Sequence, residues 1–194
     1  MHKSVEEFSV KILEIGGFGA AFHALRLPFG KECRSEAWFT SWYPDKYSSD
    51  GDRYFGYGFN CGVSIHEKDL QLLSALVRRG DEHAKVLRGV MVWCEINAPL
   101  YFWKEADTYR VGAERLSSES SMHIEGKGLS EDELVGMQEN MPNGHMQKRV
   151  WMFSYQTLRR IYYQRFDHRL PQWRMFCEWI RTLPFAQELI VCDE

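Results

Sequence analysis

Residues 148–183 decide the fold, and they read KRVWMFSYQTLRRIYYQRFDHRLPQWRMFCEWIRTL. In the first half, aromatic and apolar side chains recur three or four residues apart, which predicts a helix over 148–166. A second helix is predicted over 170–183, because Pro171 suits a first helical turn and Pro184 follows the last one. The apolar face of the first helix would carry Trp151, Tyr155, Leu158, Ile161 and Tyr162.

The same signals, residue spacing and the positions of Gly and Pro, predict most of the helices and strands in the rest of the chain. Gly16 and Gly17 should end the first strand, and Gly80 should end the longest of the earlier helices. Strand formers and helical spacing predict strands over 8–14 and 90–96, helices over 20–27, 67–79 and 83–88, and a helix from Pro99 to about Tyr109.

Three segments lack a sustained period. Residues 30–64 are punctuated by Gly, Ser, Asp and Tyr, which predicts loops or a hairpin. Residues 112–123 are Ser-rich and are predicted to be a loop. Residues 124–147 are predicted to form a variable surface excursion with about one helical turn.

Composition limits the class of protein. The 194 residues suit one domain spanning 1–194. A net charge of −3 and a pI near 6.2 argue against a general nucleic-acid-binding protein, which would be basic. No apolar run approaches the roughly 18 residues that a membrane span needs, and the acidic start lacks the apolar run of a signal peptide. Five cysteines at wide spacing, without a CxxC motif, predict reduced thiols and a cytoplasmic location.

Three polar clusters could carry chemistry, within residues 80–85, 104–123 and 165–174. Charged helix ends and Ser-rich loops are ordinarily surface features, yet these clusters hold Arg side chains and hydroxyls that suit a phosphate. The chain contains no Walker loop and no GxGxxG, HExxH or GxSxG motif. No metal site is predicted, because no local ligand pattern joins His83, His123 and His168.

The middle of the chain follows the motif order of a known family. Ala98-Pro99 ends a predicted strand, Glu105 and Thr108-Tyr109-Arg110 follow, and a Ser segment comes at 118–123. This order resembles the flavin-dependent thymidylate synthases, which have Ala-Pro, then a Gln and an Arg-His-Arg triplet, then a Ser-containing loop. The pieces TYRVG, SESSMH and HRLPQW also resemble uncharacterised phage and bacterial relatives of that family.

The C-terminal third follows the family's order more closely. The family has Leu-Pro, an aromatic-rich helix with Trp and Asn, an Arg, and then a His and Gln-Trp. Upstream, residues 24–29 are similar to an early Ala-Ala-Arg segment, and Gly80 also falls where the family has a Gly, so the resemblance covers most of 8–183. The matching C-terminal positions are Met141-Pro142, Trp151, Ser154, Leu158, Arg165, His168 and Gln172-Trp173.

This resemblance implies a single α/β domain with a small antiparallel-rich sheet packed against several helices. It implies a flavoprotein that uses FAD, NADPH and methylenetetrahydrofolate to convert dUMP into dTMP, with a pyrimidine nucleotide as substrate. It also implies a homotetramer with sites shared between subunits. Because hydride passes from the flavin to the nucleotide, the protein would supply position and electrostatics.

Site residues are carried over position by position. The resemblance implies that Arg165, Glu105 and Tyr109 are the catalytic residues. It implies flavin contacts from His83, Arg88, Arg110, Ser154 and His168, and nucleotide contacts from Ser118, Ser120, Ser121, His123 and Arg165.

Several positions depart from the family. Thr108 and Tyr109 replace an Arg and a His, and Glu105, Gln138 and Ser154 replace a Gln, an Arg and an Asn. A carboxylate at position 105 suits an N–H group on a cytosine-type edge better than a uracil carbonyl. Three functions therefore stay open: one-carbon (methyl or hydroxymethyl) transfer to a pyrimidine nucleotide, non-catalytic nucleotide binding or interaction on the same scaffold, and a structural oligomer.

Overall fold

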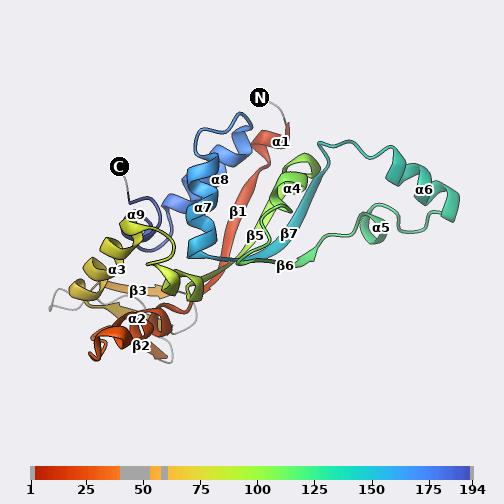
Figure 1. Cartoon of the computed structure of the whole chain (residues 1–194). Helices are drawn as coiled ribbons and strands as arrows, with labels where there is room; N and C mark the ends of the chain where they lie inside the picture. Colours follow the sequence, from red (N-terminus) through yellow and green to blue (C-terminus); the bar gives the residue numbers. More distant parts are fainter. Residues whose placement is uncertain (1–2, 40–52, 58–60, 193–194) are drawn as a thin grey trace.

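The computed structural model describes residues 3–39, 53–57 and 61–192, and its centre is a four-stranded antiparallel sheet (Figure 1). The two middle strands pair without a break, from Met91 opposite Ser154 to Pro99 opposite Met146. The strand order is β1 (Ser9–Gly16), β5 (Met91–Pro99), β7 (Met146–Ser154) and β6 (Ala113–Ser118).

Helices α4 (Leu100–Ala106), α7 (Tyr155–Arg165) and α8 (Pro171–Arg181) pack against this sheet. Aromatic side chains fill the layer between them and make the core. The Phe102 and Trp173 rings lie 4.4 Å apart, Trp103 stacks over Trp151 at 6.0 Å, and Phe153 lies 5.9 Å from Phe176. Such pairs add to the stabilisation that burial alone gives. The result is the α/β domain that the resemblance implied.

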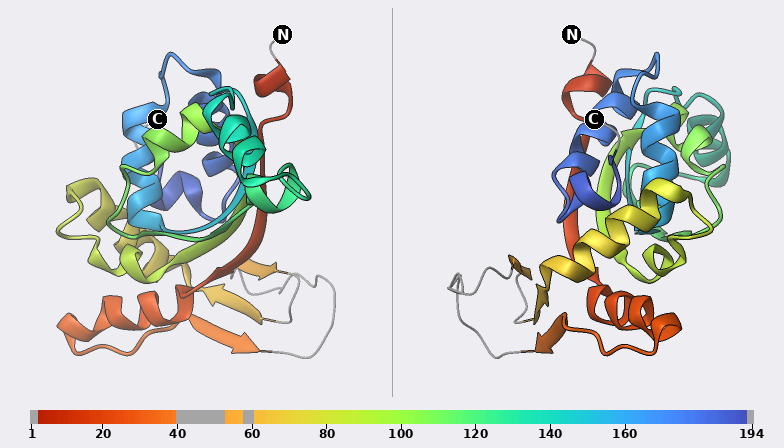
Figure 2. Two further views of the ribbon diagram at one scale, coloured as in Figure 1. Left: turned by 90° about the vertical axis from the view of Figure 1, so that its right-hand side faces the viewer. Right: turned by 60° about the vertical axis from the view of Figure 1, so that its left-hand side comes forward.

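A smaller sheet lies at one end of the molecule, beside α2 (Phe18–Arg26) and α3 (Glu67–Arg79) (Figure 2). The antiparallel pairing of β3 with β4 confirms a hairpin within 30–64, although residues 40–52 and 58–60 lie outside the described part of the chain. Its strand order is β2 (Glu36–Phe39), β4 (Cys61–Ile65) and β3 (Arg53–Tyr57).

Helix α3 has the predicted bounds, and the predicted strands and helices around it are confirmed with small shifts at their ends. Pro99 ends β5 and caps α4, one position earlier than the first helical turn. The predicted helix over 83–88 is a 3-10 turn. The short remaining elements are α1 (Lys3–Glu6), η1 (Leu27–Phe29), η2 (Lys85–Gly89) and α9 (Ala186–Leu189).

The prediction of a helix over 148–166 is wrong for its first part. Residues Met146–Ser154 form β7, and only Tyr155–Arg165 is helical. Trp151 and Phe153 are buried on one face of a strand, although Trp151 and Tyr155 also stand at helical spacing. Most of the residues of β7 before Trp151 are half-buried, so the alternation of buried and exposed residues that would indicate a strand is weak there.

The Ser-rich segment 112–123 is also more regular than the predicted loop. Residues Ala113–Ser118 form the edge strand β6, which exposes nearly all of its side chains and so lacks an apolar signal. Beyond it, residues 119–145, which we call the arm, extend away from the body of the molecule (Figure 1). The arm carries α5 (Ser121–Ile124) and the nine-residue α6 (Glu131–Glu139), which is more helix than the single turn predicted.

Two glycines are required by close backbone packing. Gly17 has a φ of 89°, and a Cβ there would lie 1.8 Å from the carbonyl oxygen of Gly89. Gly112 has a φ of 71°, and its Cβ would lie 2.5 Å from Thr157 Oγ1. Any other residue would strain the backbone and clash at both positions. Gly112 thereby allows the turn before β6 to pack on the start of α7.

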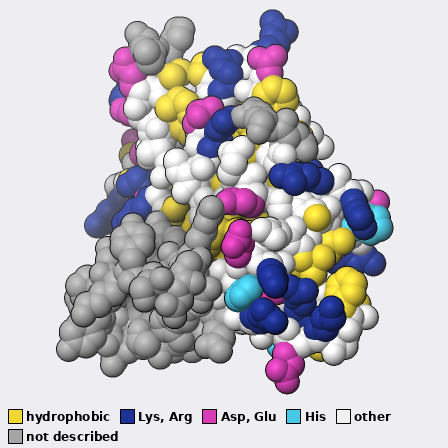
Figure 3. All heavy atoms as spheres, turned by 90° about the vertical axis from the view of Figure 1, so that its left-hand side faces the viewer, with side chains coloured by type: hydrophobic (Ala, Val, Ile, Leu, Met, Phe, Trp, Pro, Cys, Tyr) yellow, Lys and Arg dark blue, Asp and Glu magenta, His cyan; other side chains and the backbone are white. Residues whose placement is uncertain are grey.

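The described part of one face of the molecule does not present a single sign of charge (Figure 3). Figure 3 shows Lys and Arg side chains mixed with acidic and apolar ones over the described part of the left-hand face of Figure 1. In the part of the chain that the structure describes, no helix has the length and apolar character that would let it cross a membrane.

A fully buried carboxylate joins α2, α3 and the segment before β2. Asp69 accepts hydrogen bonds from Arg26 Nε (2.6 Å), Ser35 Oγ (2.8 Å) and the backbone N–H groups of Arg34 (3.1 Å) and Ser35 (3.0 Å). Burial raises the pKa of Asp69, but the hydrogen bonds from Ser35 and Arg26 and the charge of Arg26 outweigh it and hold the pKa below its ordinary value.

Replacing this carboxylate should destabilise the fold. We expect Asp69→Asn to lower the free energy of unfolding by about 3–5 kcal/mol at pH 7, because Arg26 would stay half-buried without its partner. Because the pKa of Asp69 is lowered in the folded state, this contribution is present above the ordinary pKa of about 4 and is lost as the pH falls through the folded value. Urea unfolding at pH 7 and pH 3 measures both effects.

The exposed Glu67 on the same helix gives the matched control. Glu67→Gln should change the free energy of unfolding by less than about 0.5 kcal/mol. A gap between Asp69→Asn and the parent chain that stays constant from pH 7 to pH 3 would contradict the assignment.

Candidate functional site

Five side chains, from α4, α7, α8 and the segments after α4 and α7, converge at the C-terminal end of α7. We call them the Arg165 cluster: Glu105, Tyr109, Arg165, His168 and Trp173. Arg165 Nη1 lies 2.8 Å from Glu105 Oε2 and 2.8 Å from His168 Nε2, and Arg165 Nε donates to the Tyr109 hydroxyl at 2.8 Å. The Trp173 indole N–H donates to the same Glu105 oxygen at 2.9 Å. All three residues that we expected to be catalytic are therefore in one network.

Aromatic faces hold the guanidinium from the other side. The Arg165 guanidinium carbon lies 4.7 Å from the Trp173 ring centroid and 5.7 Å from that of Tyr109. Cations are attracted to such faces, and more strongly where water is excluded. The side chains of Arg165, His168 and Glu105 are 19%, 24% and 35% exposed, so the cluster is half-buried and open on one side.

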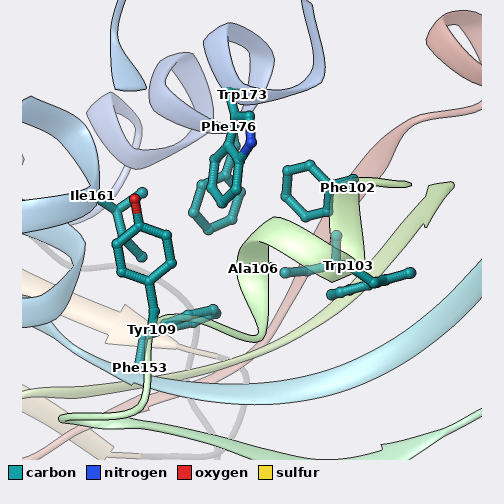
Figure 4. Close-up of a pocket in the computed structure, with 9 residues that line it drawn as sticks. Phe102, Trp103, Ala106, Tyr109, Phe153, Ile161, Trp173 and Phe176 are labelled. Atoms are coloured by element: carbon teal, nitrogen blue, oxygen red, sulfur yellow. The ribbon is translucent and has the colours of Figure 1, made fainter. Parts of the chain in front are cut away.

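A small apolar cavity lies behind the cluster (Figure 4). In the close-up, Tyr109 and Trp173 form part of its wall, with Phe102 and Trp103 on the α4 side. No polar surface lines this cavity, so water has no hydrogen-bond partner in it. Its lining residues are Ile96, Phe102, Trp103, Ala106, Tyr109, Phe153, Ile161, Trp173 and Phe176.

The His168 ring faces two donors. Its Nδ1 lies 3.2 Å from the backbone N–H of Leu170, and its Nε2 lies 2.8 Å from Arg165 Nη1. A neutral imidazole has one acceptor nitrogen, so only one of these contacts can be a full hydrogen bond at a time. The tautomer of His168 therefore decides whether the ring is held by the Leu170 N–H or by Arg165.

A second pair of charges lies next to the first and was missed in the sequence. Arg149 Nη1 donates to both carboxylate oxygens of Asp107, at 3.2 and 3.1 Å, and its guanidinium carbon lies 4.5 Å from the Trp103 ring centroid. The Arg149 side chain is 10% exposed. Burial lowers the pKa of Arg149, and the Asp107 carboxylate opposes that shift. Arg149 was missed because residues 148–154 were predicted to be helical. Only the alternation of a strand would have shown that its side chain points toward Trp103.

Ser154 is a structural cap in this fold. It is buried, its Oγ accepts from Thr157 N at 3.2 Å, and it lies 2.9 Å from Thr157 Oγ1. The backbone N–H of Ser154 bonds the Gly112 carbonyl oxygen at 2.7 Å. This side chain therefore satisfies the start of α7 and points into the protein.

The other residues expected at the flavin do not form one contact network. Arg88 Nε donates to Gln156 Oε1 at 2.7 Å in the first turn of α7, whereas Arg165 is in the last turn. A rise of 1.5 Å per residue places these ends about 14 Å apart. His83 lies 3.7 Å from Glu82, and within residues 3–39, 53–57 and 61–192 the one hydrogen bond from the Arg110 side chain goes to the Asp107 carbonyl, at 3.5 Å.

The Ser residues expected at the nucleotide lie at the base of the arm. Ser118 ends β6, His123 Nδ1 lies 2.8 Å from Ser120 Oγ, and Gln138 Nε2 donates to Ser121 Oγ at 2.7 Å. Within the described residues, no hydrogen bond or ion pair connects these side chains to the Arg165 cluster. The same part of the chain contains no group of three or more His, Cys, Asp or Glu residues that could hold a metal ion.

Comparisons with known proteins establish what class of fold this is. The sequence matches no family model, and it matches no curated protein. The structure, however, has the fold of the flavin-dependent thymidylate synthases. It is similar to two crystal structures of ThyX from Helicobacter pylori with FAD and dUMP, with TM-scores of 0.62 and 0.64.

Each likeness covers 94% of this chain and 97% of the other at 14% sequence identity. Similarity at this level establishes the fold, and it confirms the kinship in fold that the motif order indicated. Function has to be argued from the site.

The capping role of Ser154 can be measured. We expect Ser154→Ala to lower the free energy of unfolding by about 1 kcal/mol, because the cap of α7 and its bond to Thr157 are both lost. For a chain of this size, that corresponds to a fall in Tm of about 2–4 °C by calorimetry. Ser130→Ala, which removes the exposed cap of α6, should have a smaller effect. A Tm equal to that of the parent chain would contradict the capping role of Ser154.

Proposed function

We propose that this protein binds a pyrimidine nucleotide at the Arg165 cluster and transfers a one-carbon group to it with a flavin. One observation carries the proposal: Glu105, Tyr109, Arg165, His168 and Trp173 converge at an open, half-buried position. They do so on a fold whose solved neighbours were crystallised with FAD and dUMP.

In this proposal the chain's own residues position and polarise the nucleotide. Arg165 holds the ring, because Tyr109, Glu105 and Trp173 already fix its guanidinium. Oriented donors and acceptors of this kind contribute by placing the reacting groups and by stabilising developing charge. Ser118, Ser120, Ser121 and His123 hold the phosphate.

The chain has donors that suit FAD. His83, Arg88, Arg110 and His168 would contact the flavin and its phosphates, and Arg88 and Arg110 are exposed. When bound, flavin supplies hydride, NADPH reduces it, and methylenetetrahydrofolate supplies the carbon. The small cavity behind the cluster cannot hold a flat three-ring group, so the flavin would lie against the open surface. The cytoplasm remains the proposed location.

A second copy of the chain would complete such a site. The arm exposes apolar side chains that its own helices do not cover. Exposed apolar groups on a projecting segment mark an interaction surface. We therefore propose that the arm packs on another copy, in a homotetramer. The exposed arm residues are Met122, Ile124, Leu129 and Val135.

One observation favours a second candidate, a non-catalytic nucleotide-binding or interaction protein. Arg165 is already neutralised by Glu105 at 2.8 Å within the same chain. A phosphate would have to compete with that carboxylate and would be repelled by it. The same contact is compatible with recognition of an uncharged ring.

Flavin binding separates the two candidates. We expect FAD to bind with a visible change in its absorbance spectrum. Arg88→Ala and Arg110→Ala should each weaken binding roughly tenfold or more, because each removes a charge-assisted hydrogen bond worth about 1.5–3 kcal/mol. Lys11→Ala, an exposed cation on β1, is the control and should leave the affinity unchanged.

Failure of the parent chain to bind FAD at high micromolar concentration would exclude the flavin mechanism. The non-catalytic candidate would then stand.

Assembly gives a separate test. We expect the parent chain to form an assembly of several 22.9 kDa chains in light scattering, and Ile124→Asp to shift it toward the mass of one chain. The Asp side chain would lose its water in the apolar contact between chains without gaining a partner, which weakens the contact. Glu131→Gln on α6 is the control and should leave the mass unchanged. A monomeric parent chain would contradict the interface.

A further inference from the structure

We propose that Glu105, together with Arg165, makes the site select a cytosine ring over a uracil ring. This inference rests on the proposed nucleotide binding and adds the identity of the base. The Glu105 side chain is held in a fixed orientation. The base preference follows from which atoms of Glu105 and Arg165 have no hydrogen-bond partner within the part of the chain that the structure describes.

The Glu105 carboxylate is oriented by two donors on one oxygen. Oε2 accepts from Arg165 Nη1 at 2.8 Å and from Trp173 Nε1 at 2.9 Å. Trp173 is fully buried in the core, so its N–H is a fixed reference point. The carboxylate therefore has little freedom to turn, and its other oxygen keeps one direction.

The remaining atoms of the pair are open. Within the described residues, no hydrogen bond reaches Glu105 Oε1 or Arg165 Nη2, while Nε and Nη1 of Arg165 are occupied. The Glu105 and Arg165 side chains are 35% and 19% exposed. A ligand approaching from solvent therefore meets one acceptor, Oε1, and the two N–H groups of Nη2.

This pattern of one acceptor and two donors matches one pyrimidine and not the other. The pairing edge of cytosine presents a donor, the exocyclic amine, followed by two acceptors, N3 and O2. The edge of uracil presents an acceptor, a donor and an acceptor. When Oε1 and the two N–H groups of Nη2 face the whole edge in this order, cytosine matches at all three positions. Uracil in the same position sets a carbonyl against the carboxylate and its ring N–H against a donor, and acidic side chains characteristically accept from the cytosine amine.

The neighbouring groups favour a ring over a phosphate at this position. Tyr109 and Trp173 lie against the guanidinium with their apolar faces, and the Glu105 charge repels an anion. A planar, uncharged edge can use the open atoms without displacing Glu105. A phosphate would have to displace it.

Paired titrations of dCMP and dUMP test the inference, because the two share sugar and phosphate. We expect calorimetry at pH 7 to give dCMP a Kd roughly tenfold or more below that of dUMP. In Glu105→Gln the ratio should fall to one or reverse, because the amide can turn its N–H₂ outward toward a uracil carbonyl. Glu114→Gln, an exposed carboxylate on β6, should keep the parent ratio.

The outcomes separate this inference from the proposed function. If the parent chain binds dUMP as tightly as dCMP, or more tightly, the base preference is wrong while nucleotide binding stands. If neither nucleotide binds the parent chain, both proposals fail. Near-UV circular dichroism of Glu105→Gln checks that the packing of the aromatic side chains is kept. The comparison in the parent chain tests the preference even if that variant does not fold.

Discussion

The unbroken pairing of β5 with β7 is the constraint on which the rest of the structure depends. Each strand leads directly into a helix, α4 after Pro99 and α7 after Ser154, and antiparallel register puts these starts at opposite ends of the sheet. Nine paired residues span about 30 Å. The seven residues of α4 rise about 10 Å and the eleven of α7 about 16 Å, so the two helices run back toward each other and nearly fill that length. Their C-terminal ends meet, which is why Glu105 and Arg165 touch although they are 60 residues apart.

The meeting point is stabilised by charge pairs set on aromatic rings. The end of α4 supplies two carboxylates, Glu105 and Asp107. Glu105 pairs with Arg165 from α7, and Asp107 pairs with Arg149 from β7 at 3.1 Å and with Arg115 from β6 at 3.9 Å. Half-buried ion pairs gain little net stability over apolar contacts, but losing one partner leaves a costly unpaired charge. The arginines are therefore held in fixed positions by these carboxylates, and the chemistry of this surface is set by which of their N–H groups remain open.

Much of the fold follows from local patterns, and the failures have physical causes. The bounds of α3 follow from its leucine spacing and Gly80, and α8 follows from Pro171 and its apolar stripe. Strand β7 was taken for helix because its first residues are half-buried and Trp151 stands at helical spacing from Tyr155, and β6 was taken for loop because an exposed edge strand has no apolar period. The Arg165 cluster could be listed from the motif order, since three of its members match family positions. The contact between Glu105 and Arg165 could not be predicted, because contact between residues so distant in sequence depends on sheet register.

The residues expected at the site are divided between the body and the arm, and this limits how a single chain could bind a nucleotide with all of them. Arg165 lies on the body, while Ser118, Ser120, Ser121 and His123 lie at the base of a projecting arm. His123 contacts Ser120, and Ser121 accepts a hydrogen bond from Gln138 in the arm. A nucleotide held at both places within one chain would need the arm to fold back over the sheet. The pairing of β6 with β7 opposes that movement, since Ser118 is held opposite Arg149 beyond the bulge between Arg115 and Ser117. A site that uses both groups is therefore more easily made between two chains, with the body of one facing the arm of another. This arrangement would also cover the apolar side chains that the arm exposes.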